Sequence, residues 1–232
     1  MQCNIPQRPG ELVCLDYYGP LPRAKLDAFS KYVALYPLKR ATTIATIRKF
    51  LNEYVPTLGK PMGALTDRGS QFTAKLWSRE LTVAGIKPRF CSPRHPASNP
   101  AERVMRELGR VFKSFCSEKH STWLGMIPHL MQWLNVTVHE STGVTPYELQ
   151  FGRKPVSEIS RLIDWPESHR QEPSAETIIV RARNRLEKRA AARKAAAEGV
   201  GKNHIFKVND LVLVRAHHLS SAVNKEMSKF FH

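Results

Sequence analysis

The sequence lacks the long apolar runs of a membrane protein. No stretch of the 232 residues approaches the ~18 consecutive apolar residues of a membrane-spanning helix. The N-terminal residues MQCNIPQRPGE also lack the apolar core of a secretory signal peptide. We therefore expect an intracellular protein with no membrane partner.

Cysteine is scarce, and its spacing argues against a zinc site. The four cysteines, Cys3, Cys14, Cys91 and Cys116, lie far apart, whereas structural zinc sites take cysteine ligands from positions a few residues apart. The nine histidines are scattered as well. Dispersed cysteines in an intracellular chain are most simply reduced thiols that pack in the core.

Acidic residues are few beside basic ones. The chain has 36 Lys and Arg against 20 Asp and Glu, a formal net charge of +16 at pH 7. Such an excess is self-repelling unless a polyanion neutralises it, so nucleic acid is the first partner to consider. A basic surface that serves only solubility and an anionic membrane surface are the alternatives.

What the sequence does contain is an alternation of strand and helix patterns as far as residue 155. Strand patterns cover residues 11–18, 30–38, 60–66 and 86–92; helix patterns cover 44–55, 74–85, 100–116 and, interrupted at Pro128, 120–138. This alternation predicts an α/β domain built in layers. Residues 156–173 then have the composition of a linker, and 174–198 the pattern of a basic helix.

Three acidic residues stand at positions that favour metal chemistry. Asp16 lies toward the end of the first strand, Asp67 ends another strand, and Glu102 begins a helix. Such carboxylates can meet at one edge of a sheet, where their oxygens suit Mg²⁺. Structural roles remain open: Asp67 as a turn residue and Glu102 as a helix N-terminal residue. Asp16 is harder to explain structurally, because a carboxylate in an apolar strand needs a partner or exposure.

Basic residues recur at three- and four-residue steps on the helix that follows residue 100, so they share one helix face. The candidates for contact with DNA phosphates are Arg103, Arg106, Arg110 and Lys113 on this helix, with Arg68 and His95 near the acids. A solvated helix face explains the stripe equally well. The second basic run, residues 181–194, is a candidate DNA-facing connector or nuclear-import signal, or a solvated helix in which Glu187 offsets part of the charge.

Longer motifs point to a known family. The run TDRGSQFTAKLWSRELTVAGIKPRFCSPRHPASNPAERVMREL resembles the catalytic core of retroviral and Ty3/gypsy-type retrotransposon integrases. ELVCLDYYGPLP, FSKYVALYPLKRATT and TGVTPYELQFGRKP are similar to the flanking segments of that core, so the resemblance covers most of residues 8–155. It implies a ribonuclease H-like fold in which Asp16, Asp67 and Glu102 are the catalytic triad and bind two Mg²⁺ or Mn²⁺ ions. The implied partners are element DNA ends, target DNA and further copies of the chain, and the implied location is the nucleus.

The resemblance divides the chain into three parts. Residues 8–155 correspond to the integrase core, 156–200 to a linker and basic helix, and 201–232 to the truncated start of an SH3-like DNA-binding domain, which FKVNDLVLVR resembles. The segment PLPRAKLDAFSKYV joins the first strand almost directly to the strand pattern at residues 30–38. We therefore expect a mixed sheet with flanking helices that lacks one central strand near residues 22–27.

The expected function is DNA integration by metal-dependent phosphodiester strand transfer. The missing strand would be the neighbour that orients Asp16, and its loss would leave backbone N–H and C=O groups unpaired. Enzymatic activity therefore stays open. The alternatives are a domesticated or decaying relic that binds DNA without cutting it, and a protein-interaction module that uses the old fold.

Overall fold

The computed structural model describes residues 6–17, 23–38, 40–91, 101, 104, 108–111, 114, 123–155 and 173–200. The chain divides into two compact units, residues 1–192 and 193–232, and the strands that the structure describes belong to the first. No helix in the described part of the chain has both the length and the apolar character needed to cross a membrane. The expected SH3-like segment, residues 201–232, lies outside the described residues.

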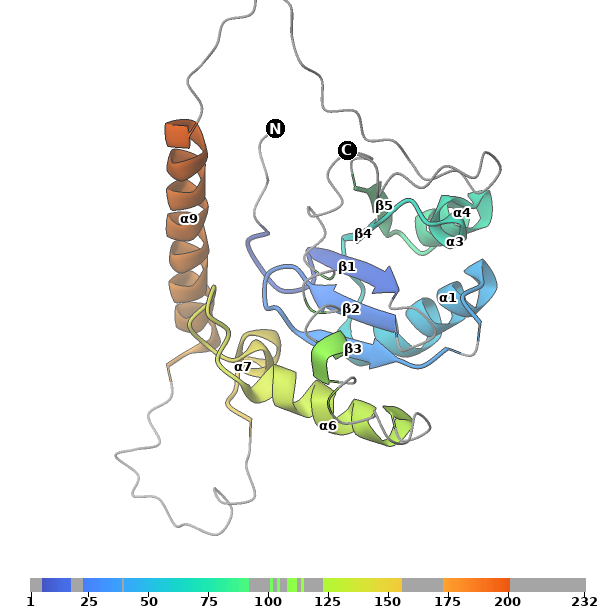
Figure 1. The fold of residues 1–232 in the computed structure, drawn as a ribbon, viewed down its shortest axis with the longest axis horizontal. Helices are drawn as coiled ribbons and strands as arrows, with labels where there is room; N and C mark the ends of the chain where they lie inside the picture. The colour runs from blue at the N-terminus through green and yellow to red at the C-terminus, as the bar shows by residue number, and fades with distance from the viewer. Residues whose placement is uncertain are drawn as a thin grey trace, which may run out of the picture. The chain divides into compact units, whose positions relative to one another are not determined.

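A five-stranded mixed sheet forms the centre of the first unit (Figure 1). In spatial order its strands are β3 (Val33–Tyr36), β2 (Arg23–Asp27), β1 (Leu12–Tyr17), β4 (Gly63–Thr66) and β5 (Lys87–Phe90). The first three strands in sequence pair antiparallel, whereas β4 pairs parallel with both β1 and β5. Helices connect the parallel strands, as the alternation in the sequence predicts.

The expectation of a missing central strand is wrong. Residues Arg23–Asp27 form β2, which lies between β1 and β3 and pairs with both. The sequence RAKLD hides this strand because three of its five residues are charged, and central strands are normally apolar. The structure accommodates two of these charges by burying Lys25 among aromatic rings and by making Asp27 a hydrogen-bond acceptor at the end of the strand.

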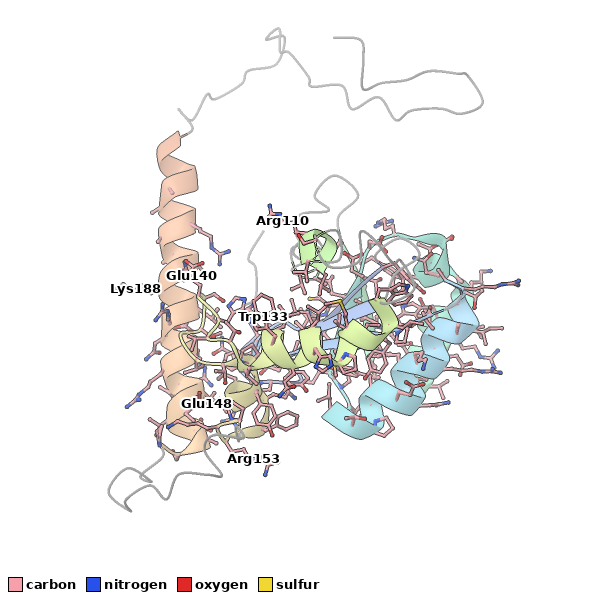
Figure 2. The ribbon with its side chains drawn as sticks, turned by 60° about the horizontal axis from the view of Figure 1, so that its bottom comes forward. Arg110, Trp133, Glu140, Glu148, Arg153 and Lys188 are labelled. Carbon is pink, nitrogen blue, oxygen red and sulfur yellow. The ribbon has the colours of Figure 1, made fainter. Side chains whose placement is uncertain are left out.

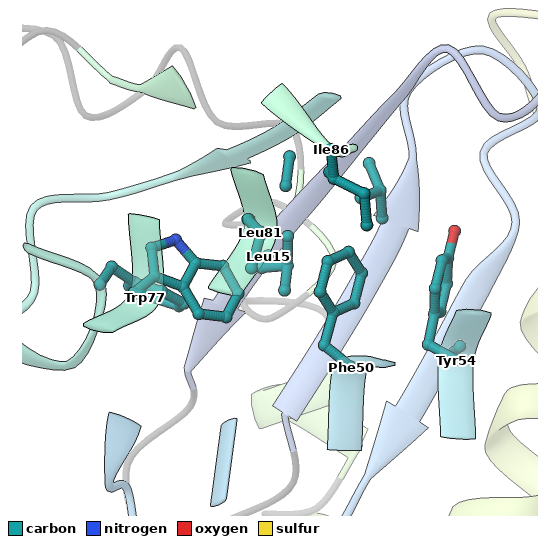
Figure 3. Close-up of a cluster of buried hydrophobic side chains, with 10 residues drawn as sticks. Leu15, Phe50, Tyr54, Trp77, Leu81 and Ile86 are labelled. Atoms are coloured by element: carbon teal, nitrogen blue, oxygen red, sulfur yellow. The ribbon is translucent and has the colours of Figure 1, made fainter. Parts of the chain in front are cut away.

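One face of the sheet is covered by the helices that follow β3 and β4. They are α1 (Thr43–Lys49), the π-helical turn η1 (Phe50–Tyr54), α2 (Val55–Leu58), α3 (Ser70–Thr73) and α4 (Lys75–Val83). Thr42 caps α1, since its hydroxyl accepts a hydrogen bond from Ala45 N at 3.2 Å. Figure 3 shows the first core between these helices and the sheet, where Phe50, Trp77 and Leu81 pack on Leu15.

The same core contains a buried cation. Lys25 is fully buried, and its Nζ donates a 2.8 Å hydrogen bond to the carbonyl of Lys49. The ammonium group also lies 4.2 Å from the ring centroid of Tyr36 and about as close to the rings of Phe50 and Tyr54. Cation–π attraction and one hydrogen bond thus offset part of the desolvation of the charge.

The opposite face of the sheet carries the second core. It includes Cys14 of β1, Leu26 of β2, the helical residues Ala101 and Leu108, and Ile127 of α6 (Trp123–Val136). α6 runs unbroken through Pro128, so the predicted interruption is wrong. Pro128 is exposed to solvent. Because proline has no N–H, the carbonyl one turn earlier lacks its helical donor, and on this exposed side it can bond to water instead.

α6 also protects one edge of the sheet. The side chain of Asn135 accepts a hydrogen bond from Val33 N and donates one to Val33 O, both at 2.8 Å. Through this pair of bonds the amide satisfies the outward backbone groups of Val33 in edge strand β3, as a neighbouring strand would.

The other edge is strand β5. Lys87 N and Cys91 N donate to Met62 O and Thr66 O of the neighbouring segment, at 3.0 and 2.8 Å. Because backbone direction alternates along a strand, Pro88 occupies a position whose N–H would point outward. Proline has no N–H, so this edge lacks one of its outward donors.

Two further helices follow in the described residues, α7 (Pro146–Phe151) and α9 (Ala175–Val200), and α9 continues past residue 192, where the first unit ends. α9 confirms the basic helix predicted over residues 174–198. In the third core, Ile178, Ala182 and Leu186 of α9 pack against Phe29 and Leu149. These positions recur every four residues, which places them on one face of the helix.

Candidate functional site

Two of the predicted acids occupy neighbouring positions at the carboxyl ends of β1 and β4. The two strands are parallel, and Leu15 is level with Thr66. Asp16 and Asp67 each follow one of these residues directly. Adjacent strands lie about 4.8 Å apart, so the register places the backbones of the two acids side by side.

The alternation of side chains indicates the face on which these acids lie. Cys14 and Leu65 contact the second core, whereas Val13, Leu15 and Ala64 contact the first. Asp16 and Asp67 each come two residues after a member of the second-core set, and side chains two apart in a strand share a face. Both acids are half-buried. We therefore assign them to the face that carries the second core.

The helical residues that surround the third predicted acid pack on this same face. Ala101 is fully buried in the second core, and Leu108 is buried there too. Glu102, which follows Ala101 in the sequence, lies outside the described residues. Among the residues that the structure does describe, no group of three or more His, Cys, Asp and Glu side chains could hold a metal ion.

Local hydrogen bonds orient both carboxylates. Asp16 Oδ1 accepts from the backbone N–H of Tyr17 at 2.8 Å, and Asp67 Oδ1 accepts from that of Gly69 at 3.1 Å. The second bond is the turn role that the sequence left open for Asp67. It is compatible with metal binding, because a carboxylate has two oxygens and about four lone-pair sites.

The end of β1 is held in place by a residue that sequence reasoning missed. The ring of Tyr17 packs on Phe72 with centroids 5.3 Å apart, and its hydroxyl forms a short hydrogen bond with Thr46. Tyr17 thereby ties the residue after Asp16 to α1 and α3. The available signal was its alternation with Leu15 on the apolar face of the strand; its partner, far away in sequence, could not be identified.

Two of the six predicted DNA contacts fall within the described residues. Arg68 is exposed, and its Nε donates to the carbonyl of Cys91 at 3.3 Å. Arg110 is also exposed and projects from its helix in Figure 2. The other four, Arg103, Arg106, Lys113 and His95, lie outside the described residues.

The thiols near the acids are packing groups. Cys14 and Cys91 are both free and buried, as the dispersed spacing predicts. Burial raises the pKa of the Cys14 thiol to about 12, so it stays protonated at neutral pH. The donors that the described residues offer at these strand ends are therefore carboxylate oxygens, which suit a hard cation such as Mg²⁺ or Mn²⁺.

The chain is similar to several known proteins. Residues 6–96 match the family model described as the integrase core domain. The chain is 31% identical over 156 residues to the Pro-Pol polyprotein of feline foamy virus, an alignment that covers 63% of this chain and 13% of the polyprotein. It is 26% identical over 184 residues to the transposon Tf2-3 polyprotein of Schizosaccharomyces pombe, covering 75% and 14%. The chain thus spans only a small part of these curated relatives.

Solved structures show the same fold. The simian T-cell lymphotropic virus intasome, in complex with PP2A regulatory subunit B56 gamma, superposes with a TM-score of 0.57 at 20% identity and covers 71% of this chain and 60% of that chain. The HTLV-2 integrase catalytic core domain in complex with magnesium gives a TM-score of 0.50 at 22% identity, covering 62% and 97%. The expected ribonuclease H-like fold, a mixed sheet with flanking helices, is confirmed, and so is the resemblance to integrase cores.

Proposed function

We propose that this chain, whose residues 6–96 match the integrase core domain, joins retroelement DNA ends to target DNA by metal-dependent strand transfer. The observation that carries the proposal is the parallel register of β1 and β4. It brings Asp16 and Asp67 level at the ends of two adjacent strands of the sheet. The completed sheet supports activity over decay, because Asp16 has β2 beside it, paired at Ala24.

In this proposal Asp16, Asp67 and Glu102 hold two Mg²⁺ or Mn²⁺ ions through their carboxylate oxygens. When bound, two such ions activate an attacking water or 3′-hydroxyl and stabilise the leaving oxygen. The protein fixes the direction of its ligands: β1 and Tyr17 hold Asp16, and the turn at Gly69 holds Asp67. A solved neighbour is described as being in complex with magnesium.

DNA is the proposed partner on both sides of the reaction. The net charge of +16 supplies attraction at long range. Arg68 and Arg110, with Arg103, Arg106, Lys113 and His95, would contact phosphates, which position DNA without reading its sequence. We also propose a nuclear location, because a protein that joins DNA to chromosomal targets acts where the chromosomes are. We also propose a homo-oligomer, since the solved neighbours are described as an intasome and as trimeric and dimeric cores.

The test is strand transfer on a short labelled duplex with Mg²⁺ or Mn²⁺, comparing the chain with its Asp67→Asn variant. Asparagine keeps an oxygen for Gly69 N but loses the charge that a metal needs, so the turn survives and the metal site does not. We expect metal-dependent products that fall to background in the variant. Glu187→Gln likewise removes one carboxylate, here an exposed one on α9, and as the matched control it should retain full activity.

Two other outcomes would each favour an alternative. Salt-dependent DNA binding without any product would identify a relic that binds DNA and does not cut it. Neither products nor DNA binding would leave the protein-interaction module. Either result would refute strand transfer by this chain.

A further inference from the structure

We propose that α9 carries a DNA-binding surface of its own, formed by Arg181, Arg185 and Lys188. We name these three residues the α9 ridge. Its ligand is the phosphate backbone of double-stranded DNA, bound without regard to sequence. The ridge requires neither the metal site nor strand transfer.

Several contacts hold α9 on the first unit. Its apolar face is buried in the third core. Arg8 pairs with Glu176 near its start, with Nη2 and Oε1 3.1 Å apart, and Arg189 forms a short ion pair with Glu140 further along. Arg183 Nη2 also donates to the carbonyl of Gln7 at 3.2 Å. The helix is therefore a fixed support for the charges on its flank.

The three cations are spaced to follow a DNA strand. Steps of four and three residues place Arg181, Arg185 and Lys188 on one flank of α9, and all three are exposed. At 1.5 Å per residue they extend over about 10 Å. A DNA strand carries one phosphate per 3.4 Å of helix axis, so the ridge spans about three phosphates.

Other cations of α9 have polar partners on the first unit, whereas Arg185 lies beside Gly143 and stays exposed. Arg183 and Arg189 are engaged with Gln7 and Glu140. Among the residues that the structure describes, no carboxylate forms an ion pair with any member of the ridge. Figure 2 shows Lys188 on α9, with Glu140 beside the same helix. The positive charge of the ridge is thus left for an external polyanion.

The helix suits DNA better than an anionic membrane. A helix that lies in a membrane interface buries an apolar face among the lipids. In α9 that face, formed by Ile178, Ala182 and Leu186, is already packed against Phe29 and Leu149. The remaining surface offers phosphate contacts but no large apolar face for insertion.

The ridge lies away from the carboxylates. α9 packs on Phe29, which follows the end of β2 where Asp27 is level with Val13. Asp16 is level with Ala24, at the opposite end of the same strand pair. Val13 and Asp16 are three residue steps apart along β1, about 10 Å of strand. α9 is therefore anchored beyond the end of the β1–β2 pair that is opposite to Asp16.

The test measures binding of a labelled duplex of arbitrary sequence to the full chain by fluorescence anisotropy, in EDTA and over a range of salt. The variant replaces Arg181, Arg185 and Lys188 with Gln. Loss of three phosphate contacts should reduce the slope of log K against log salt by about 2.7. Between 50 and 200 mM salt, the affinity of the unchanged chain should therefore fall about 40-fold more than that of the variant.

A charge-matched control replaces three exposed cations elsewhere, Arg48, Lys60 and Lys75, with Gln. It should keep the slope of the unchanged chain, and replacing Arg181 and Arg185 with Lys should do the same because charge is retained. An unchanged slope in the ridge variant would overturn the proposal. So would an equal loss in the control, or tighter binding of the unchanged chain to phosphatidylserine vesicles than to DNA. Asp67→Asn should bind DNA normally in EDTA, so a failure of strand transfer would leave this result intact.

Discussion

The Asp27→Asn substitution tests how the unexpected strand β2 is stabilised at its end. The carboxylate of Asp27 is buried and accepts four hydrogen bonds. Oδ1 accepts from Phe29 N, Ser30 N and Ser30 Oγ at 3.1, 2.7 and 2.8 Å, and Oδ2 accepts from Gly10 N at 2.8 Å. One side chain thus ties the β2–β3 turn to the segment that precedes β1.

The magnitude follows from these four bonds. Asparagine keeps the oxygen at the Oδ1 position but turns an amide N–H toward the N–H of Gly10, so one bond to a charged acceptor is lost, worth ~1.5–3 kcal/mol. The three remaining bonds lose the strengthening that a charge gives. Removing a buried charge offsets part of this loss. We expect the free energy of unfolding to fall by about 1–3 kcal/mol, and by ~4 kcal/mol or more in Asp27→Ala, which removes all four acceptors.

The difference between Asp27 and its Asn variant should also depend on pH. Burial, opposed in part by the four hydrogen bonds, raises the pKa of Asp27 above its ordinary 3.8. The folded chain therefore takes up this proton at a higher pH than the unfolded chain does. Its stability relative to the variant should rise as pH falls through the folded pKa toward 3.8, and this gain should be absent above the folded pKa.

Urea unfolding followed by tryptophan fluorescence measures both effects, since Trp77 is fully buried in the first core. Equal stability of Asp27→Asn and the unchanged chain at pH 7 would refute the hydrogen-bond argument. The stability advantage of the unchanged chain over Asp27→Asn should not shrink as pH falls. If it did, the four hydrogen bonds would lower the pKa of Asp27 by more than burial raises it, which would refute the direction of the shift.

Three more substitutions or treatments test other parts of the fold. Asn135→Asp should lower the free energy of unfolding at pH 7 by ~2–4 kcal/mol in urea melts, because an uncompensated charge would face the carbonyl of Val33; a neutral result would contradict the edge-capping role. Lys25→Met should be less destabilising than Lys25→Ala, since methionine fills the aromatic site without a buried charge. Alanine would leave a cavity that lowers the free energy of unfolding by ~2–4 kcal/mol. The reverse order in the same melts would show that the ammonium is essential. Cys14, buried and with its pKa raised to about 12, should resist iodoacetamide at pH 8 until urea unfolds the chain; labelling of the native state, read by mass spectrometry, would contradict this burial.

Local signals in the sequence predicted much of the helical and strand structure. Thr42 caps its helix, and Gly85 ends α4 with a φ of 73°, a value that glycine adopts without strain. The alternation of apolar residues in β1 also matches the two faces of the sheet. In each case the information lies within a few residues, where sequence patterns are most reliable.

Long-range contacts explain what sequence reasoning missed. Lys25 makes RAKLD look unlike a strand, and its aromatic surroundings come from residues such as Phe50 and Tyr54 that only tertiary structure brings near. Sequence alone identified Asp16 and Asp67 as candidates, but their level position depends on the register of two parallel strands. That register depends on matching the buried faces of two strands that are far apart in the sequence, so no single local pattern encodes it.

Pro88 in β5, together with the amide of Asn135 against β3, has a consequence for how copies of this chain associate. Backbone pairing between molecules needs a free row of donors and acceptors, and the two flanks of this sheet do not offer a complete one. A multimer should therefore assemble through side chains on its helices and loops, while the sheets of separate copies stay discontinuous. The same arrangement also hinders the sheets of neighbouring copies from adding to one another edge to edge into fibrils.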